Sequence, residues 1–286
     1  MNRYAASRKF AGLGLVLFGI TGLVWSQDRD KKAGEKTAQG RIEKRTYDFK
    51  EAGKEMEYAL YVPKSYVKGK KTPLMVALHG LKSNPQQILR YPGFTSLAEK
   101  HGYILVAPMG YNSQGWYGAN GPRSPASPGT IILLGATAYF SNSNPENLGE
   151  LSEKDVMNVL ALVRKDFTID EKRIYLMGHS MGGGGTWHLG LKHPDVWAGL
   201  APIAPAIFRK ASVVEKIKHI PVILVQGDKD KLVPVAGARR WAEEMKKQNM
   251  TYEYIEVPGG GHVDVAFQNL GKIFEFFEKQ KKREKQ

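Results

Sequence analysis

The sequence predicts an α/β fold in which a central, mostly parallel β-sheet is covered by helices on both faces. Short apolar runs alternate along the chain with longer segments that carry apolar residues at helical spacing. Most of the short runs are apolar at nearly every position, as in strands that are buried on both sides. Polar or glycine-rich turns follow several of these runs, and in such sheets functional loops gather at the carboxyl ends of the strands.

The elements follow in a regular order. Two segments at the start, 45–51 and 56–63, alternate apolar and polar residues and are expected to pair as antiparallel strands. Apolar runs predict further strands at 74–78, 103–107, 173–177, 198–203, 222–226 and 252–257. Helices are expected at 94–101, 152–166, 181–192, 235–248 and 264–281, with a short one near 211–217.

The most specific feature is GHSMG at 178–182, directly after the apolar run 174–177. A strand that passes through a sharp turn into a helix presents the central residue, Ser180, at the apex of the turn. Glycines on either side remove the side chains that would collide with the neighbouring strand and helix. A nucleophilic serine needs a base and a carboxylate, so we expect a histidine and an acidic residue to lie nearby in the fold.

Candidates for both roles follow later strands. Asp228 and Asp230 lie in the polar turn after the run 222–225, and His262 lies in the glycine-rich loop after 252–257. The chain order Ser, Asp, His occurs in one large class of serine hydrolases. Both aspartates sit at the carboxyl end of a strand, so the strand pattern leaves the choice between them open.

A fourth component is a site for the oxyanion that forms when a serine attacks a carbonyl. The run 74–78 ends in His79-Gly80-Leu81. A backbone N–H of this turn would act together with the N–H of Met181 to stabilise the negative charge.

These segments together resemble secreted serine esterases of the α/β-hydrolase superfamily, the group of bacterial carboxylesterases, polyhydroxybutyrate depolymerase-like and feruloyl esterase-like enzymes often labelled predicted peptidases. The matching segments are HGL (79–81), APMGY (107–111), GWYG (115–118), LSEKDVMNVL (151–160), RIYLMGHSMGG (173–183), DKLVP (230–234) and GGGH (259–262).

The resemblance implies an α/β-hydrolase fold with Ser180, Asp230 and His262 as catalytic residues. Asp230 is favoured because Asp230, Val233 and Pro234 match the family's D-x-x-V-P pattern, and Asp228 is the alternative. Leu81 and Met181 would be the backbone donors of the oxyanion hole. The implied activity is a serine carboxylic-ester hydrolase that acts on small or short-chain esters through an acyl-enzyme intermediate, without a cofactor. Alternatives are a polyester depolymerase, a small serine peptidase and a catalytically silent binding module.

The long stretch 108–150 has no regular pattern, and loops of this length in compact domains usually have a function of their own. Trp116, Tyr117 and the apolar cluster 131–134 are therefore candidates for lining a substrate pocket, with ordinary packing as the alternative. Trp187 is expected in the core. His79 and His179 are expected to have structural side chains.

Composition excludes several classes of site. The chain has no cysteine, which excludes thiolate nucleophiles and disulfides. The histidines lack metal-ligand spacing and no nucleotide-binding glycine motif is present, so neither a metal nor a nucleotide cofactor is expected. The net charge is +14, but the basic runs lack interleaved aromatic residues, so no nucleic-acid partner is expected. Oligomeric state is not specified by any pattern.

The predicted organisation has four parts: a signal peptide at 1–26, a charged linker at 27–41, a single catalytic domain at 42–281 and a basic tail at 282–286. Three basic residues precede the apolar run Phe10 to Trp25, as in export signals. This run is shorter than the roughly 20 residues that a spanning helix needs. We therefore expect a secreted or periplasmic protein without stable membrane insertion after signal cleavage.

Overall fold

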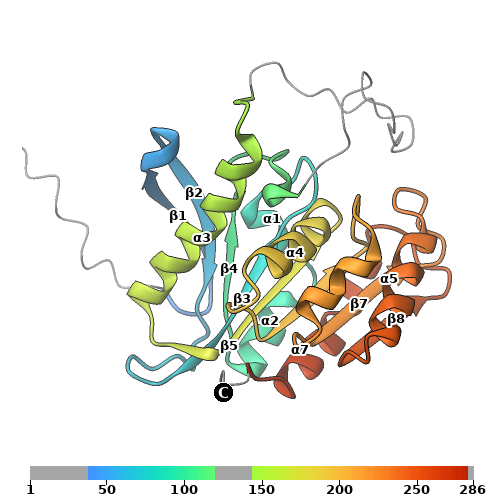
Figure 1. The fold of residues 1–286 in the computed structure, drawn as a ribbon. Coiled ribbons are helices and arrows are strands. Elements are labelled where there is room, and N and C mark those ends of the chain that lie inside the picture. Colours follow the sequence, from blue (N-terminus) through green and yellow to red (C-terminus); the bar gives the residue numbers. More distant parts are fainter. Residues whose placement is uncertain (1–37, 120–143, 283–286) are drawn as a thin grey trace, which may run out of the picture. The chain divides into compact units, whose positions relative to one another are not determined.

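The computed structural model describes residues 38–119 and 144–282, whose elements all belong to the compact unit Thr37–Gln286. Eight strands form one sheet in the order β1-β2-β4-β3-β5-β6-β7-β8 (Figure 1). β1 (Ile42–Phe49), β2 (Lys54–Tyr61) and β4 (Ile104–Pro108) pair antiparallel, β1 with β2 and β2 with β4. The parallel part contains β4, β3 (Thr72–Leu78), β5 (Ile169–His179), β6 (Gly199–Ile203), β7 (Val222–Gly227) and β8 (Tyr252–Val257).

Helices cover both faces of this sheet, which confirms the predicted fold class. One face carries α3 (Leu148–Asp166), α4 (Met181–Lys192), α5 (Val235–Lys247) and the 3₁₀ segment Ala211–Ile217. The other carries α1 (Pro85–Leu89), α2 (Phe94–His101), α6 (Val265–Gln268) and α7 (Leu270–Glu278). Alternate residues of each buried strand face opposite sides. Leu74 and Val76 accordingly belong to one core cluster, and Met75 and Ala77 belong to the other.

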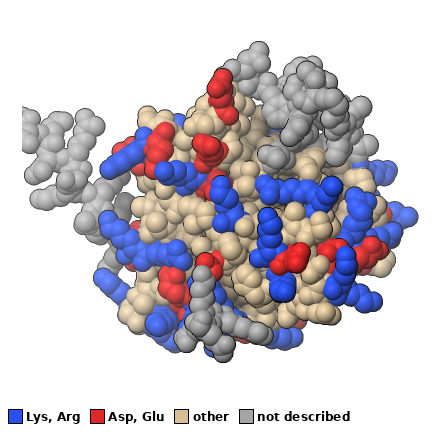
Figure 2. All heavy atoms as spheres, in the orientation of Figure 1, with Lys and Arg blue, Asp and Glu red and all other residues tan. Residues whose placement is uncertain are grey.

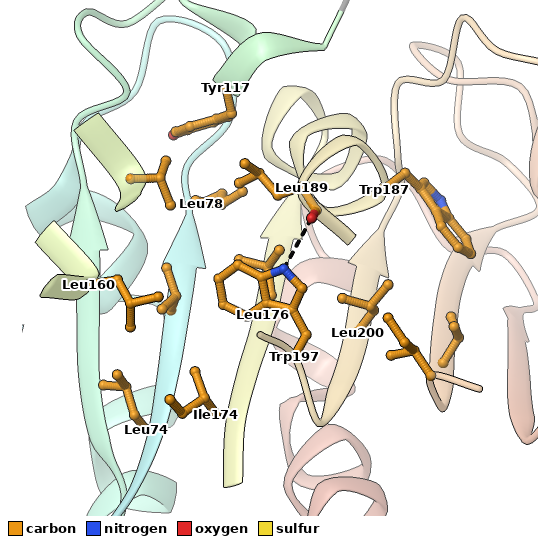
Figure 3. Packing of buried hydrophobic residues seen from close by; sticks show 14 of the residues in the cluster. Leu74, Leu78, Tyr117, Leu160, Ile174, Leu176, Trp187, Leu189, Trp197 and Leu200 are labelled. Carbon is orange, nitrogen blue, oxygen red and sulfur yellow. Dashed lines mark hydrogen bonds between the residues drawn. The ribbon is translucent and has the colours of Figure 1, made fainter. Parts of the chain in front are cut away.

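The core on the α3–α4–α5 side shows this packing directly (Figure 3). Leu160 of α3 lies across from strand residues such as Leu74 and Leu176, and the Trp197 indole N–H donates to the carbonyl of Leu189 at 3.1 Å. Trp187 is 2% exposed, and its ring centroid lies 4.2 Å from that of Trp241. The predicted core position of Trp187 is confirmed.

Several boundaries differ from the prediction. The segment expected as one helix at 264–281 is divided at Asn269 into α6 and α7, and asparagine favours such breaks because its side chain competes for backbone hydrogen bonds. The sequence patterns missed α1, although Asn84 caps it by accepting a hydrogen bond from the N–H of Gln87 at 3.0 Å. α3 begins at Leu148, ahead of the predicted residue 152.

Some predictions lie outside the described residues: the signal peptide, the linker up to residue 37, the apolar cluster 131–134 and the tail from residue 283. Within the ranges 38–119 and 144–282, the helices are too short or too polar to cross a membrane.

Candidate active site

Ser180 lies at the apex of the turn between β5 and α4. Its backbone has φ 60° and ψ −114°, a conformation that costs a residue with a side chain about 1–3 kcal/mol. A Cβ atom on Gly178 would overlap the carbonyl of Gly182, and a Cβ atom on Gly182 would overlap the carbonyl of Leu78. Strand and helix therefore approach too closely for side chains at these two positions, and this packing holds the serine in the strained turn.

Three side chains from three strand ends meet at this turn. Ser180 Oγ lies 2.9 Å from Nε2 of His262, and Nδ1 of His262 lies 2.7 Å from Oδ2 of Asp230. A carboxylate only accepts hydrogen bonds, so Nδ1 carries the ring proton, and Nε2 is left to accept from the serine hydroxyl. The side chains meet because the carboxyl ends of β5, β7 and β8 lie at one edge of the sheet.

Asp230, and not Asp228, contacts His262. The Asp230 side chain is fully buried, and its Oδ1 accepts hydrogen bonds from two backbone N–H groups of the following turn, both at 2.8 Å. Burial acts to raise the pKa of Asp230, but hydrogen bonds from His262 and these N–H groups outweigh it, so the pKa lies below its ordinary value. Asp228 instead accepts a hydrogen bond from the N–H of Gly259 at 2.7 Å. The contact geometry thus distinguishes the two aspartates that the strand pattern left open.

The turn after β3 brings backbone N–H groups to the same place. A Cβ atom on Gly80 would lie 3.6 Å from Cβ of Ser180. The Gly80 carbonyl accepts a hydrogen bond from the N–H of Ser83 at 3.1 Å, which helps to fix the peptide between Gly80 and Leu81. In the described part of the chain, the N–H groups of Leu81 and of Met181, the first residue of α4, show no hydrogen-bond partner. Both are therefore available as donors to an oxyanion, the role predicted for them.

Trp116 and Tyr117, predicted as substrate contacts, are part of the protein interior. Tyr117 is fully buried, and its hydroxyl donates to the carbonyl of His79 at 3.3 Å. Trp116 is 5% exposed, and its ring centroid lies 5.4 Å from that of Phe208. Figure 3 shows Tyr117 with the core residues, beyond Leu78 at the end of β3. A fully buried ring cannot contact a substrate without moving, so the predicted contact is wrong for Tyr117 in this conformation, and packing accounts for both aromatic residues.

The loop before Tyr117 is held by two buried polar side chains of α3, which we call the Asp155–Ser152 anchor. Asp155 accepts hydrogen bonds from the hydroxyl of Tyr47 and from the N–H of Gly110, both at 2.6 Å. Ser152 donates to the Gly110 carbonyl at 2.7 Å and accepts from the N–H of Tyr117 at 2.9 Å. Burial raises the pKa of Asp155 to about 6, against the lowering effect of its hydrogen bonds.

The segment 151–160 contributed only to the resemblance, and the sequence patterns assigned no role to Ser152 and Asp155, although a signal is present. Ser152 and Asp155 are buried together with Leu151, Val156 and Val159 on the inner side of α3. Polar residues at core positions of an amphipathic helix are costly unless they are hydrogen-bonded, so they indicate a specific polar contact.

No group of three or more His, Asp or Glu side chains in residues 38–119 and 144–282 is arranged to hold a metal ion. A cavity of about 710 Å³ lies at the opposite edge of the sheet. It is lined by residues at or before the amino ends of strands, among them Ala198, Pro221 and Thr251. Since the serine, histidine and aspartate lie at the carboxyl ends, this cavity is separate from their site.

Basic residues are spread over the surface drawn in Figure 2. Lys and Arg side chains outnumber Asp and Glu there, and groups of Asp and Glu lie between them over part of the face. Such mixing is typical of a solvated protein face. The expectation that no nucleic acid binds stays a prediction.

Comparison with known families agrees with this arrangement. A model of the Esterase family, described as "Putative esterase", matches residues 50–270. The chain belongs to the Esterase family. The predicted resemblance is thereby confirmed at the level of the family.

Two relatives illustrate how far the similarity of this Esterase-family chain extends. S-formylglutathione hydrolase of Rattus norvegicus is 27% identical over 154 residues, 52% of this chain and 51% of the relative. Cutinase 2 of Thermobifida cellulosilytica is 33% identical over 167 residues, 57% of this chain and 60% of the relative. The chain thus spans about half the length of the first relative and about three fifths of the second.

Solved structures match a larger share of this Esterase-family chain. A ferulic acid esterase from Anaeromyces mucronatus in complex with ferulic acid superposes with a TM-score of 0.62 at 19% identity, over 88% of this chain and 95% of that chain. A thermostable esterase superposes with a TM-score of 0.60 at 24% identity, over 84% of this chain and 63% of that chain. At these identities the similarity shows the fold alone, and it confirms the predicted α/β-hydrolase fold.

Proposed function

We propose that this Esterase-family protein is a serine hydrolase that cleaves small or short-chain carboxylic esters through an acyl-enzyme intermediate. The observation that carries the proposal is the continuous hydrogen-bond chain from Ser180 Oγ through His262 to Asp230. Family membership supports ester substrates, as do relatives named S-formylglutathione hydrolase, cutinase and ferulic acid esterase.

In the first half of the proposed cycle, Ser180 Oγ attacks the ester carbonyl carbon while Nε2 of His262 takes the serine proton. Asp230 stays ionised, because its pKa lies below the ordinary value, and it stabilises the imidazolium that forms. The N–H groups of Leu81 and Met181 donate to the oxyanion, and the amino end of α4 adds a favourable dipole. The bond to the alkoxy oxygen then breaks, and His262 returns the proton to the leaving alcohol.

In the second half, a water molecule takes the place of the alcohol. His262 removes a proton from this water as its oxygen attacks the acyl carbon on Ser180. The same N–H groups stabilise the second oxyanion, and its collapse releases the acid and restores the serine hydroxyl. The proposed cycle needs no cofactor, since each proton moves between Ser180, His262 and the reacting alcohol or water.

Substitution of Ser180 by alanine tests the proposal. We expect kcat on p-nitrophenyl acetate to fall by a factor on the order of 10⁴ or more, because only oxyanion and binding contributions survive. The matched control is Ser212→Ala, at an exposed serine of the 3₁₀ segment 211–217. A folded Ser180→Ala protein with near wild-type turnover would rule out the assignment.

The same preparation then defines the substrate class. A panel of p-nitrophenyl esters of increasing acyl length, methyl ferulate, hydroxybutyrate oligomers and peptide amides separates short-chain esterase, polyesterase and peptidase activities. We expect the short-chain esters to be cleaved and the amides to react far more slowly. A catalytically silent binding module would cleave none of them and would not react with a fluorophosphonate probe.

One observation favours polymeric esters as a second candidate. Leu81, Leu232 and Val263 are exposed apolar side chains, and each is at or within two residues of a proposed catalytic or oxyanion position. Single exposed apolar residues are common, but several beside one site offer an apolar rim to an extended ester substrate. Leu232→Ser and Val263→Ser should then reduce hydrolysis of hydroxybutyrate oligomers several-fold more than hydrolysis of p-nitrophenyl acetate, roughly as expected for losing one apolar contact each.

The control for this apolar rim is Val67→Ser, because Val67 is 58% exposed and lies before β3, at the other end of that strand from the oxyanion turn. Equal losses on the soluble and the oligomeric ester would exclude the apolar rim as a polymer contact.

We also propose that the protein is exported from the cytoplasm. The basic and apolar pattern of residues 1–26 supports this proposal. Amino-terminal sequencing of the protein from a bacterial expression host should find a new terminus near Ser26 in the periplasm or medium. Full-length protein confined to the cytoplasm would contradict it.

A further inference from the structure

His179, the residue before the serine, has a buried ring that bridges two other segments. Its Nε2 lies 2.8 Å from the backbone carbonyl oxygen of His262, and its Nδ1 lies 2.8 Å from the hydroxyl of Tyr91. A carbonyl oxygen only accepts, so Nε2 carries the proton. Burial, with a smaller contribution from the nearby His262, lowers the pKa of His179 to about 4. The ring is therefore neutral at pH 7, and Nδ1 accepts the hydrogen bond from Tyr91.

The loop that carries His262 needs such a contact. Three consecutive glycines, 259–261, precede His262, and glycine gives a loop more conformational freedom than any other residue. Hydrogen bonds hold the neighbouring residues of this loop, for example the N–H of Gly259 on Asp228 and the N–H of Gly261 on Asp264. Within the described residues, the only hydrogen bond recorded for the main chain of His262 itself is the one from His179.

The other end of this bridge is rigid. His179 is the last residue of β5 and pairs with Ile203 in the parallel ladder. Tyr91 packs its ring 5.9 Å from that of His179 and 6.4 Å from that of Phe267, between centroids. The bridge therefore links a central strand, the turn after α1 that carries Tyr91, and the loop before α6.

We propose that His179, oriented by Tyr91, is a positioning residue that fixes the main chain of His262 and thereby the distance from its imidazole to Ser180 Oγ. The inference rests on the proposed roles of Ser180 and His262. Three titratable groups face the His179 ring: Tyr91, His262 and, beyond it, Asp230. The His179 and His262 ring centroids are 4.9 Å apart, so a charged His179 would repel the imidazolium formed in catalysis. Because the His179 ring is neutral, it does not oppose the stabilisation of the His262 imidazolium by Asp230.

Three substitutions test this role. His179→Leu removes both hydrogen bonds, whereas His179→Gln keeps an N–H donor at a similar reach to imidazole Nε2. We expect kcat on p-nitrophenyl acetate to fall about 10- to 100-fold in the leucine variant, with KM changed less than about twofold, as for loss of a residue that orients another. The glutamine variant should recover most of kcat, and Tyr91→Phe should lose only about two- to fivefold.

Matched controls are His101→Leu, at a histidine that stacks on Phe274 away from the serine, and Tyr103→Phe, at a buried tyrosine before β4. Both should leave kcat and KM unchanged. The rate of fluorophosphonate labelling of Ser180 serves as a second readout, because it reports serine activation even if the proposed ester substrates are wrong. It should follow the same order of variants.

The tautomer of His179 provides a test that needs no variant. Nitrogen-15 NMR of histidine-labelled protein, with His179→Gln to assign the signal, should show a neutral ring with its proton on Nε2 from pH 8 down to about 5. A proton on Nδ1, or a second proton gained above pH 6, would overturn the proposal.

The kinetics of the variants also test whether His179 is a positioning residue. The proposal would be overturned if His179→Leu left kcat and the labelling rate unchanged, or if His179→Gln were no more active than His179→Leu. A raised KM with an unchanged kcat would also overturn it, because it would show that His179 contacts the substrate. If the leucine variant does not fold, the glutamine and Tyr91→Phe variants together with the NMR result decide in the same way.

Discussion

Asp230 and Asp155 both lie inside this Esterase-family protein, yet their pKa values move in opposite directions. Hydrogen bonds outweigh burial at Asp230, which accepts from the His262 ring and from two backbone N–H groups, and the pKa falls. Burial outweighs hydrogen bonds at Asp155, which accepts from Tyr47 and Gly110, and the pKa rises to about 6.

The comparison shows that the hydrogen-bond partners of a buried aspartate determine whether its pKa is lowered or raised. Asp230 faces a histidine that can become positively charged, so its own negative charge is useful in the proposed reaction. Asp155 faces a phenol hydroxyl and the backbone N–H groups of Gly110 and Tyr111, which hold a loop in place. The positive charge of Lys54 lowers the pKa of Asp155 less than these hydrogen bonds do. Asp230 therefore acts in the proposed reaction, whereas Asp155 holds the Gly110–Tyr117 loop in its conformation.

The largest effect is expected at Asp230. Asp230→Asn keeps the size of the side chain but favours the wrong His262 tautomer, so kcat should fall by roughly 10³–10⁴. Asp228→Asn is the matched control and should cost about tenfold or less, since this residue only braces the N–H of Gly259. Steady-state kinetics on p-nitrophenyl acetate would show a reversed ranking if Asp228 were the functional carboxylate.

A smaller effect, on stability, is expected at Asp155. Well below pH 4 this carboxyl is protonated in both the folded and the unfolded protein, so its raised pKa carries no penalty there. Between about pH 4 and pH 6 the unfolded state ionises while the folded state still holds the proton, so stability falls by about 3 kcal/mol over this range and changes little above it. Asp155→Asn removes this dependence.

Urea unfolding of both proteins at pH 4 and pH 7 measures the difference. The loss of free energy of unfolding between the two pH values should be roughly 2–3 kcal/mol larger for the wild type than for Asp155→Asn, because other titrating groups contribute equally to both. An identical pH dependence would show that Asp155 has an ordinary pKa and that the contrast with Asp230 is not real.

The smallest effect is expected at the end of the anchored loop. Tyr117→Phe removes the hydrogen bond to the His79 carbonyl and should lower the free energy of unfolding by about 1 kcal/mol. If Tyr117 only packs, the ratio of kcat/KM values for acetate and butyrate esters stays unchanged. A changed ratio, measured with p-nitrophenyl esters, would show that Tyr117 does influence substrate binding.

The parts that the sequence predicted well are those fixed by local chemistry. Gly178 and Gly182 flank Ser180 because of close backbone contacts, and such a turn is visible in five consecutive residues. Parallel strands share one edge for their carboxyl ends, so the chain positions of Asp230 and His262 already implied that they could meet Ser180.

The remaining features depend on contacts between distant segments. The choice between Asp228 and Asp230 depends on the path of the loop that carries His262, because this path determines which carboxylate the imidazole reaches. The placement of Tyr117 depends on Ser152 of α3, which is 35 positions away in the chain. The ring of His179 finds its partners 88 and 83 positions away, and no local pattern reveals such contacts.

The most direct test of the central claim is capture of the acyl-enzyme. Wild-type protein mixed with an excess of a p-nitrophenyl ester, quenched in acid within the first turnovers and digested, should yield the peptide containing Ser180 with the added mass of the acyl group. The same peptide from Ser180→Ala should carry no added mass. Steady ester hydrolysis with the acyl group on a different residue would contradict the account.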